Sequence, residues 1–242
     1  MSKIRLDKAC LSYISTRSKA QDAIVEGRVS VNGKVITKAS YLINEDDSIE
    51  IQSKENDYVS RAGNKLQAAF DTFQFDISNQ IVLDIGASTG GFTDVCLRHN
   101  AKKVYALDVG HLQLAKELDE NEKVIKMEGM NARELEPEWF YDSIDFICMD
   151  VSFISCKTIL ARIFDTLTVK HLAVLIKPQF ECGPALLNKQ GVLKDKKVQK
   201  RIVDDVTQFV ETKYKKVKVI PCPITGRSGN QEFILYACER RT

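Results

Sequence analysis

Five polar residues stand at the ends of predicted strands. Apolar runs rich in β-forming residues, QIVLDIG, KVYALDVG, KVIKMEG, IDFICMD and HLAVLIKPQ, lead to these polar residues, which are Asp84, Asp108, Glu128, Asp150 and Lys177. In an open α/β sheet the carboxyl ends of parallel strands meet at one edge, and ligands bind just beyond them. The five residues are therefore candidates for one site.

The first of these strands runs into a turn of small residues, in the stretch VLDIGASTGGFTD at residues 82–94. Gly86, Gly90 and Gly91 allow the backbone to approach a ligand closely, and a helix that begins near Gly91 offers amides to an anion. The spacing G-x-x-x-G-G matches neither the dinucleotide pattern nor the P-loop, and the turn has no lysine for a phosphate. S-adenosylmethionine suits the turn, because its small carboxylate can meet these amides.

Two acids extend this interpretation. Asp108 can accept both ribose hydroxyls of the cofactor, and Asp84 can pair with the methionine ammonium, directly or through water. The alternative is a glycine-rich turn that only packs a helix against the sheet, but an acid about 20 residues further along favours the cofactor. The predicted cofactor contacts are Asp84, Gly86, Ser88, Thr89, Gly90, Gly91, Phe92, Asp108, Val109, Glu128, Asn131 and Asp150.

A methyl transfer to an alcohol requires a base, because a hydroxyl is hardly ionised at neutral pH. A lysine made partly neutral by desolvation or by another cation can take that proton. Lys177 and Asp150 end strands, Lys65 lies in SRAGNKLQAAF before the first strand, and Glu232 opens the last strand. We expect these four groups to titrate as a unit. We interpret Lys177 as the group on the hydroxyl; for any one of them, a surface ion pair is the commoner role.

The pattern from residue 58 onward predicts an α/β fold. Strands alternate with helical stretches such as HLQLAKELDE, CKTILARIFDTL and KKVQKRIVDDVTQFVETKYKK, which indicates a parallel sheet covered on both faces. The last runs, KVKVIPCPI and EFILYACER, have no helix between them and predict an antiparallel pair. This is the class I, Rossmann-like arrangement of S-adenosylmethionine-dependent methyltransferases, a mostly parallel seven-stranded sheet with a reversed last strand.

A small α+β module is predicted before it. Ile4, Ala9, Leu11 and Ile14 have near-helical spacing, and a second helix capped by Ser15 or Thr16 carries Ala20, Ala23 and Ile24 and ends at Gly27. Asn32-Gly33 predicts a hairpin, residues 41–51 close with another strand, and the polar stretch QSKEND reads as a linker. The predicted domains are residues 1–57 and 58–242.

Charge and cysteine usage narrow the function classes. The net charge of +2 points to no partner, but residues 1–38 carry eight Lys/Arg against three acids, which fits either a polyanion-binding surface or a solvated helix face. Seven scattered cysteines without a C-x-x-C pair argue against a disulfide framework or a metal site. Without a signal peptide or a long apolar run, we expect a cytoplasmic monomer that does not enter a membrane.

Several motifs together resemble one family, the TlyA-type S4-domain rRNA methyltransferases, some of which are called haemolysin A. They are TRSKAQDAIVEGRVSVNG, YVSRAGNKL, DIGASTGGFTD, VYALDVGHLQL, MDVSFIS, LIKPQFE and GNQEF. The catalytic part is similar to FtsJ-like ribose 2′-O-methyltransferases, whose Lys-Asp-Lys-Glu tetrad falls on Lys65, Asp150, Lys177 and Glu232. The resemblance implies methyl transfer from S-adenosylmethionine to a cytidine 2′-hydroxyl in ribosomal RNA or a ribosomal subunit.

The resemblance also implies an RNA-binding surface and a substrate. The S4-like module would contact RNA through Arg5, Arg17, Lys19, Arg28, Asn32 and Lys34. The chain is similar to the short form of the family, which modifies 23S rRNA alone, whereas a longer form modifies 16S rRNA as well. Two other functions stay open: a membrane-lytic protein, as the haemolysin name suggests, and an RNA-binding assembly factor with an inactive methyltransferase fold.

Overall fold

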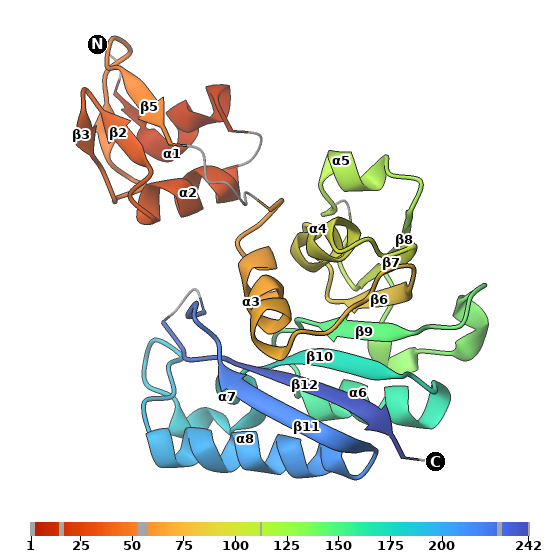
Figure 1. Cartoon of the computed structure of the whole chain (residues 1–242). Helices are drawn as coiled ribbons and strands as arrows, with labels where there is room; N and C mark the ends of the chain where they lie inside the picture. The colour runs from red at the N-terminus through yellow and green to blue at the C-terminus, as the bar shows by residue number, and fades with distance from the viewer. Residues whose placement is uncertain (1–2, 15–16, 53–57, 112, 227–228, 242) are drawn as a thin grey trace. The chain divides into compact units, whose positions relative to one another are not determined.

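A computed structural model describes residues 3–14, 17–52, 58–111, 113–226 and 229–241 of the chain (Figure 1). The chain forms two compact units, Met1–Arg61 and Ala62–Thr242. The predicted caps Ser15 and Thr16 and most of the predicted linker, residues 53–57, lie outside the described residues. Among the described residues, no helix has the length and apolar character needed to cross a membrane.

Short helices and small antiparallel sheets form the N-terminal unit, as predicted. Its elements are β1 (Ile4–Arg5), α1 (Leu6–Ala9), η1 (Cys10–Ser12), α2 (Arg17–Val25), β2 (Val29–Val31), β3 (Lys34–Val35), β4 (Leu42–Ile43) and β5 (Ile49–Ile51). Strand β1 pairs with β4, and β2 lies between β3 and β5. Apolar side chains from α1, α2, β2 and β4 fill its core.

The first helix differs from its prediction. Ile4 lies in strand β1 and is 39% exposed, and Leu11 is 46% exposed, so neither belongs to a buried helical face. The buried face carries Leu6 and Cys10, which are four residues apart and therefore lie one above the other on a helix. Ala9 and Ile14 of the predicted face do pack against the core. The prediction is wrong for Ile4, because it pairs with Ile43 across a small sheet, a contact between residues far apart in sequence.

Two glycines act as predicted in the N-terminal unit. Gly27 has a φ of +72°, and the amide of Arg28 donates to the carbonyl of Ala23, which is the Schellman ending of a helix. The β2–β3 hairpin turns at Asn32 and Gly33, with φ values of 50° and 75°. Two successive left-handed residues are what a type I′ turn requires.

One seven-stranded sheet forms the centre of the C-terminal unit (Figure 1). Its strands are β6 (Ile81–Ile85), β7 (Lys103–Asp108), β8 (Val124–Glu128), β9 (Phe146–Met149), β10 (His171–Ile176), β11 (Tyr214–Pro221) and β12 (Phe233–Arg240), in the order β11-β12-β10-β9-β6-β7-β8. Strands β6 to β10 run parallel, and β12 is antiparallel to both neighbours. The predicted mostly parallel sheet with a reversed last strand is confirmed.

Helices cover both faces of this sheet. They are α3 (Gly63–Phe73), α4 (Gly91–Arg98), α5 (Lys116–Asp119), α6 (Cys156–Thr166), α7 (Pro178–Glu181) and α8 (Lys196–Glu211), with 3-10 turns η2 (Ala132–Glu134), η3 (Pro137–Trp139) and η4 (Pro184–Leu186). Helices α3 and α4 pack together on one face, and α6 and α8 pack together on the other (Figure 1). Both faces are therefore buried, which explains why β6 and β9 are apolar along their whole length apart from Asp84.

Two predicted helices are shorter than expected. Among the described residues of 111–120, which exclude residue 112, the structure makes only Lys116–Asp119 helical. The long helical stretch ends at Glu211, and Tyr214 already begins strand β11. The predicted helix of 21 residues would have included the lysine-rich segment 213–216. In the structure, the side chain of Tyr214 is fully buried, whereas Lys215 and Lys216 are exposed, as at the edge of a sheet.

Candidate active site

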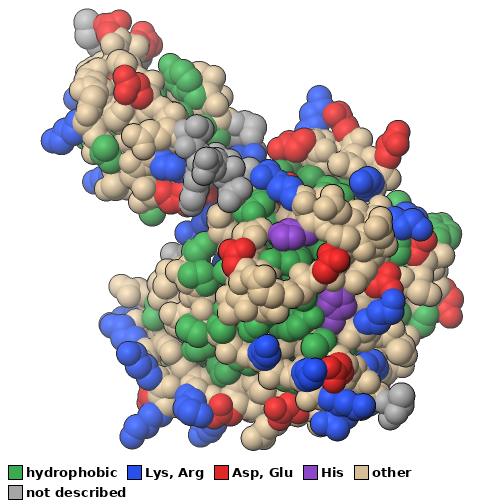
Figure 2. Space-filling view, in the orientation of Figure 1, with side chains coloured by type: hydrophobic (Ala, Val, Ile, Leu, Met, Phe, Trp, Pro, Cys, Tyr) green, Lys and Arg blue, Asp and Glu red, His purple; other side chains and the backbone are tan. Residues whose placement is uncertain are grey.

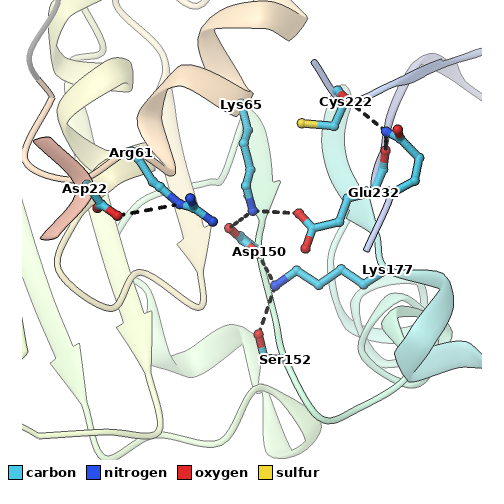
Figure 3. Close-up of polar contacts among 9 residues, drawn as sticks. Asp22, Arg61, Lys65, Asp150, Ser152, Lys177, Cys222 and Glu232 are labelled. Carbon is cyan, nitrogen blue, oxygen red and sulfur yellow. Dashed lines mark hydrogen bonds and ion pairs between the residues drawn. The ribbon is translucent and has the colours of Figure 1, made fainter. Parts of the chain in front are cut away.

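Four ionisable side chains from different elements converge at the carboxyl edge of the C-terminal sheet (Figure 3). Lys65 comes from the first turn of α3, Asp150 follows β9, Lys177 follows β10, and Glu232 directly precedes β12. Strands β9 and β10 are parallel neighbours, so the residues that follow them meet. Because β12 runs in the opposite direction, the residue before it lies at the same edge. We call these four residues the tetrad.

Ion pairs connect the tetrad into one chain. The Lys65 Nζ lies 2.6 Å from Glu232 Oε2 and 3.6 Å from Asp150 Oδ2. The other oxygen of Asp150 lies 2.5 Å from Lys177 Nζ. The side chains are 4–13% exposed, so the charges are largely removed from water. Asp150 therefore joins the two lysines, and Glu232 contacts Lys65 alone among them.

Lys65 stays protonated in this arrangement. Burial disfavours its ammonium, but the negative charges of Asp150 and Glu232 outweigh burial and raise the pKa of Lys65 above its ordinary value. A lysine that keeps its proton cannot serve as a base. It can hold Asp150 in place and contribute a fixed positive charge.

Lys177 has a different set of partners. Its Nζ pairs with Asp150 and donates a hydrogen bond of 2.9 Å to the hydroxyl of Ser152. Ser152 is exposed, whereas Lys177 is 7% exposed, so the buried lysine contacts a residue at the surface. The arrangement offers one buried amine, oriented by one ion pair and one hydrogen bond, at the carboxyl edge of the sheet.

The glycine turn after β6 is tightly packed against its own chain. Gly86 has a φ of +83°, and a Cβ there would lie 2.6 Å from the carbonyl oxygen of Asp150. Gly90 has a φ of +92°, and its Cβ would lie 2.2 Å from the side chain of Leu118. Both glycines are therefore required by the fold itself. Gly91 begins helix α4, and Phe92 is buried with it.

Asp108 is fixed by two backbone amides. Its Oδ2 accepts from the amide of Ser88 at 2.8 Å, and its Oδ1 accepts from the amide of Gly110 at 2.7 Å. Each carboxylate oxygen has a further lone pair. The side chain is thus held next to the glycine turn while it can still accept hydroxyl groups.

Asp84 is the most buried acid of the predicted set. It is fully buried, Thr93 donates to its Oδ2 at 2.7 Å, and its Oδ1 has no hydrogen-bond partner within the described part of the chain. Burial raises the pKa of Asp84 to about 7, although the Thr93 hydrogen bond acts in the opposite direction. A buried carboxylate with one oxygen unused fits a cationic ligand group that this chain does not supply.

The remaining predicted cofactor residues follow β7 and β8. The Glu128 Oε1 accepts from the amide of Gln113 at 2.9 Å, so this acid also holds the segment after β7. Asn131 caps η2 by accepting from the amide of Arg133. Val109 is 66% exposed, and Thr89 is half-buried. Val109, Glu128 and Asn131 thus stand at or after the ends of β7 and β8, at the same carboxyl edge as the glycine turn and Asp108.

Asp7 organises the predicted RNA-binding arginines of the N-terminal unit. This carboxylate is fully buried, and it accepts from Arg5, from Arg17 and, at 2.8 Å, from Gln21. Each arginine donates through Nε and Nη2, and the two side chains stay 41% and 47% exposed. Their hydrogen bonds hold the pKa of the Asp7 carboxyl well below its usual range, the bond from Arg5 contributing most.

The other predicted RNA-binding residues have mixed surroundings. Arg28 donates to Glu26 and to the carbonyl of Gln52, and its side chain is only 17% exposed. Asn32 donates to Asp47 and accepts from the amide of Ser48, so its side-chain amide is used in hydrogen bonds within the N-terminal unit. Lys34 is exposed beside the hairpin turn, whereas Lys19 is half-buried. Arg5, Arg17 and Lys34 thus offer the most accessible positive charge of the set.

Three residues that contact predicted site residues were not predicted: Ser152, Thr93 and Asp7. Ser152 follows Asp150 by two residues, and Thr93 lies one helical turn after Gly90, so the sequence already places both near predicted site residues. Hydrogen-bonding partners, however, cannot be read from spacing. The seven cysteines are free thiols, and the described residues contain no group of three or more His, Cys, Asp or Glu placed to hold a metal ion.

Comparisons with known proteins identify the family of the chain. The family model described as FtsJ-like methyltransferase matches residues 58–238, and the S4 domain model matches residues 4–49. "Hemolysin A" of Brachyspira hyodysenteriae is 42% identical over 238 residues, which are 96% of this chain and 99% of that protein. The "23S rRNA (cytidine-2'-O)-methyltransferase TlyA" of Campylobacter jejuni is 34% identical and covers 91% of this chain and 93% of its own length.

A solved structure from Streptococcus thermophilus, whose description names a hemolysin, has the same architecture. It superimposes with a TM-score of 0.76 at 34% identity and covers 99% of this chain and 89% of that one. The chain therefore belongs to the family of FtsJ-like methyltransferases that carry an S4 domain, the family of the proteins named TlyA and hemolysin A.

Proposed function

We propose that this protein transfers a methyl group from S-adenosylmethionine to the 2′-hydroxyl of a cytidine in ribosomal RNA, with Lys177 as the base. The observation that carries the proposal is the contrast between the two lysines. Lys65 is held as an ammonium by two carboxylates, whereas Lys177 pairs with one carboxylate and donates to the exposed hydroxyl of Ser152. The relative from Campylobacter, named for methylation of 23S rRNA, makes 23S rRNA the first substrate to test.

The cofactor site lies at the glycine turn and at the ends of β6 and β7. S-adenosylmethionine supplies a methyl group on a positively charged sulfur, which is reactive enough to need only a better nucleophile. Asp84 would pair with its ammonium, because the free Oδ1 is a buried acceptor. Asp108 would accept the ribose hydroxyls, and the amides at the start of α4 would meet the carboxylate.

Proton transfer falls to Lys177. A neutral amine has two N–H groups and one lone pair. The Nζ pairs with Asp150 and donates one N–H to Ser152, so a neutral Lys177 would keep its lone pair for a hydroxyl group. The proton of the 2′-hydroxyl moves to Nζ as the oxygen takes the methyl group. Lys65, fixed by Glu232, keeps Asp150 aligned.

The N-terminal unit would bind the RNA through phosphate contacts. Arg5 and Arg17 present exposed guanidinium groups around Asp7, and Lys34 stands beside the hairpin turn. Such contacts position a protein on RNA without reading its sequence, whereas the 2′-hydroxyl itself distinguishes RNA from DNA.

The test is methyl transfer by the purified protein. Isotope-labelled S-adenosylmethionine is incubated with 23S rRNA, with 16S rRNA and with intact ribosomal subunits, and the modified nucleotide is mapped. We expect a 2′-O-methylcytidine in 23S rRNA. Lys177→Ala should abolish transfer and leave cofactor and RNA affinity nearly unchanged. The control Lys170→Ala should be fully active, because Lys170 is exposed and precedes β10, at the opposite end of the strand from Lys177.

Other outcomes would replace the proposal. RNA that is bound but never methylated would indicate an assembly factor with an inactive fold. Release of dye from lipid vesicles by a protein that leaves rRNA unmethylated would favour the lytic function. Equal activity of Lys177→Ala and the unmodified protein would remove Lys177 from its assigned role.

A further inference from the structure

A second basic surface lies on the C-terminal unit. Segment 189–201 carries six cations, Lys189, Lys194, Lys196, Lys197, Lys200 and Arg201, with Asp195 as its one acid. All six cations are exposed. Figure 2 shows Lys and Arg side chains gathered over the part of the surface where α8 begins (lower left). We call this segment the α8 basic surface.

The cations of this surface are poorly neutralised. Lys200 pairs with Asp204 at 2.7 Å. Within the described part of the chain, the other five make no ion pair at 4.0 Å or less. Some lysines elsewhere in the unit, such as Lys103 and Lys157, pair with acids. Positive side chains that lie close together without acidic partners repel one another. A polyanionic partner would remove this repulsion.

Helix stability does not explain these residues. The first turn of α8 contains Lys196 and Lys197 and no acid. The helix dipole makes this end positive, so cations here are unfavourable. Asp195 already caps the helix by accepting from the amides of Lys197 and Val198. The lysines are thus unfavourable for the helix that carries them.

This surface is tied to the tetrad. The side chain of Asn230 accepts from the amide of Leu193 and donates to the carbonyl of Gly191, both at 3.0 Å. Leu193 is buried, and its carbonyl accepts from Gln199. Asn230 precedes Glu232 by two residues. The segment before α8 is therefore fixed to the loop that delivers one tetrad residue, at the carboxyl edge of the sheet.

We propose that the α8 basic surface binds backbone phosphates of the RNA strand next to the methylated nucleotide. The inference rests on the proposed function and adds a second RNA contact, independent of the N-terminal unit. Within the segment, Leu193 is buried and Val198 is half-buried, so its exposed side chains are mainly cations, which suit phosphates. A membrane-surface segment would instead present an apolar side that can enter the lipid.

The experiment compares two double variants with the same change in charge. Lys196→Glu/Lys197→Glu alters the α8 basic surface, and it should also stabilise α8, because acids favour the start of a helix. The control Lys102→Glu/Lys123→Glu alters exposed lysines that precede β7 and β8, at the amino edge of the sheet. Affinity for a 23S rRNA fragment is measured with full-length protein at several salt concentrations.

We expect the α8 variant to lose roughly tenfold or more in RNA affinity and to lower the slope of log K against log[salt] by about 0.7–0.9 for each lost phosphate contact. Its affinity for S-adenosylmethionine and its melting temperature should match or exceed those of the unmodified protein. Equal affinities and slopes for the two double variants would overturn the inference. So would a loss of binding to phosphatidylserine vesicles without any loss of RNA binding.

The two proposals fail separately. If the unmodified protein methylates no rRNA, the proposed function is lost. If the unmodified protein methylates 23S rRNA, and the α8 variant binds RNA and turns over like its control, only the inference about the α8 basic surface is refuted.

Discussion

Lys177 donates a hydrogen bond of 2.9 Å to the hydroxyl of Ser152 while its Nζ pairs with Asp150 at 2.5 Å. Both partners lie on the stretch that follows β9, so the residues after one strand orient the amine that follows the neighbouring strand. If Lys177 is the base, as proposed, Ser152 would restrict the direction in which its amine accepts a proton.

Ser152→Ala should therefore slow methyl transfer without weakening binding. Loss of one hydrogen bond allows the Lys177 amine to rotate, and we expect kcat to fall by roughly tenfold, which corresponds to about 1.4 kcal/mol. Ser152 is exposed, so its replacement removes no core contact. Steady-state kinetics with 23S rRNA measure kcat and KM separately. Ser152→Thr keeps the hydroxyl and should retain most of the activity; equal loss in both variants would show that size, not hydrogen bonding, matters.

Gly226→Ala should impair activity with little effect on stability. A Cβ at Gly226 would lie 2.6 Å from Glu232 Oε1, the end of a side chain that can turn away. The turned carboxylate would lose its 2.6 Å contact with Lys65. We expect a fall in kcat of roughly tenfold or more, with a change in the free energy of unfolding of about 0.5 kcal/mol.

Gly183→Ala is the matched control for this substitution. A Cβ at Gly183 meets nothing within 4 Å, so it should change neither activity nor stability. Unchanged kcat in Gly226→Ala would mean that the position of Glu232 is not needed for transfer. A large loss of stability would mean that the turn, rather than the carboxylate, yields to the new methyl group.

The sheet of the C-terminal unit could be predicted because its strands are buried on both faces. Residues 81–85 and 146–149 are apolar apart from Asp84, and such runs ending in a polar residue are typical of parallel strands. The helix carrying Lys65 was not predicted, and neither was the β-strand at Ile4–Arg5. That strand forms through pairing with residues 42–43, which local spacing does not reveal.

The candidate site could be predicted only in outline. Strand ends identified Asp108, Asp150 and Lys177, because topology alone brings such positions to one edge. The choice of Lys65 and Glu232 depended on the family resemblance. Lys65 lies at the start of a helix and Glu232 at the end of a loop, and no topological rule brings such positions to the edge of the sheet. The glycines were predicted as close approaches to a ligand, whereas a Cβ at Gly86 would first meet the backbone of this chain itself.

The buried acid Asp84 should make stability depend on pH. Burial raises its pKa to about 7, whereas the unfolded chain releases this proton near pH 4. Between these values the folded protein holds a proton that the unfolded chain has lost. The free energy of unfolding therefore falls as pH rises, by at most about 1.4 kcal/mol per pH unit from this group. Asp84→Asn should flatten this dependence between pH 4.5 and 7 in denaturant titrations, whereas Asp165→Asn, at an exposed acid, should not.

Cofactor binding should release a proton through the same group. Below pH 7 Asp84 is mostly protonated in the ligand-free protein, and pairing with the cofactor ammonium favours its ionised form. Calorimetry at pH 6 in buffers of different ionisation enthalpy should therefore detect release of close to one proton for the unmodified protein. Asp84→Asn should release none and bind more weakly. Equal proton release by both proteins would assign it to another group.

Asp7→Asn should loosen the arginine cluster of the N-terminal unit. Arg5 and Arg17 lower the pKa of Asp7, so its ionised form stabilises the fold above about pH 4, the unfolded value, and this contribution is lost as pH falls below it. At pH 7 we expect a loss of about 1–3 kcal/mol, seen as faster hydrogen exchange of α2 amides in the full-length protein. The exposed Asp46→Asn is the control and should leave this exchange unchanged.

The same variant separates positioning of the arginines from charge. Asp7→Asn makes the protein more positive, so electrostatic attraction alone predicts tighter binding to rRNA. If Asp7 holds Arg5 and Arg17 in the orientation that meets phosphates, binding instead weakens, because the bonds of both guanidiniums to one carboxylate are lost. Affinity for the 23S rRNA fragment at fixed salt decides between the two. We expect Asp7→Asn to bind more weakly and Asp46→Asn to bind slightly more tightly; tighter binding by both would mean that the arginines act only through their charge.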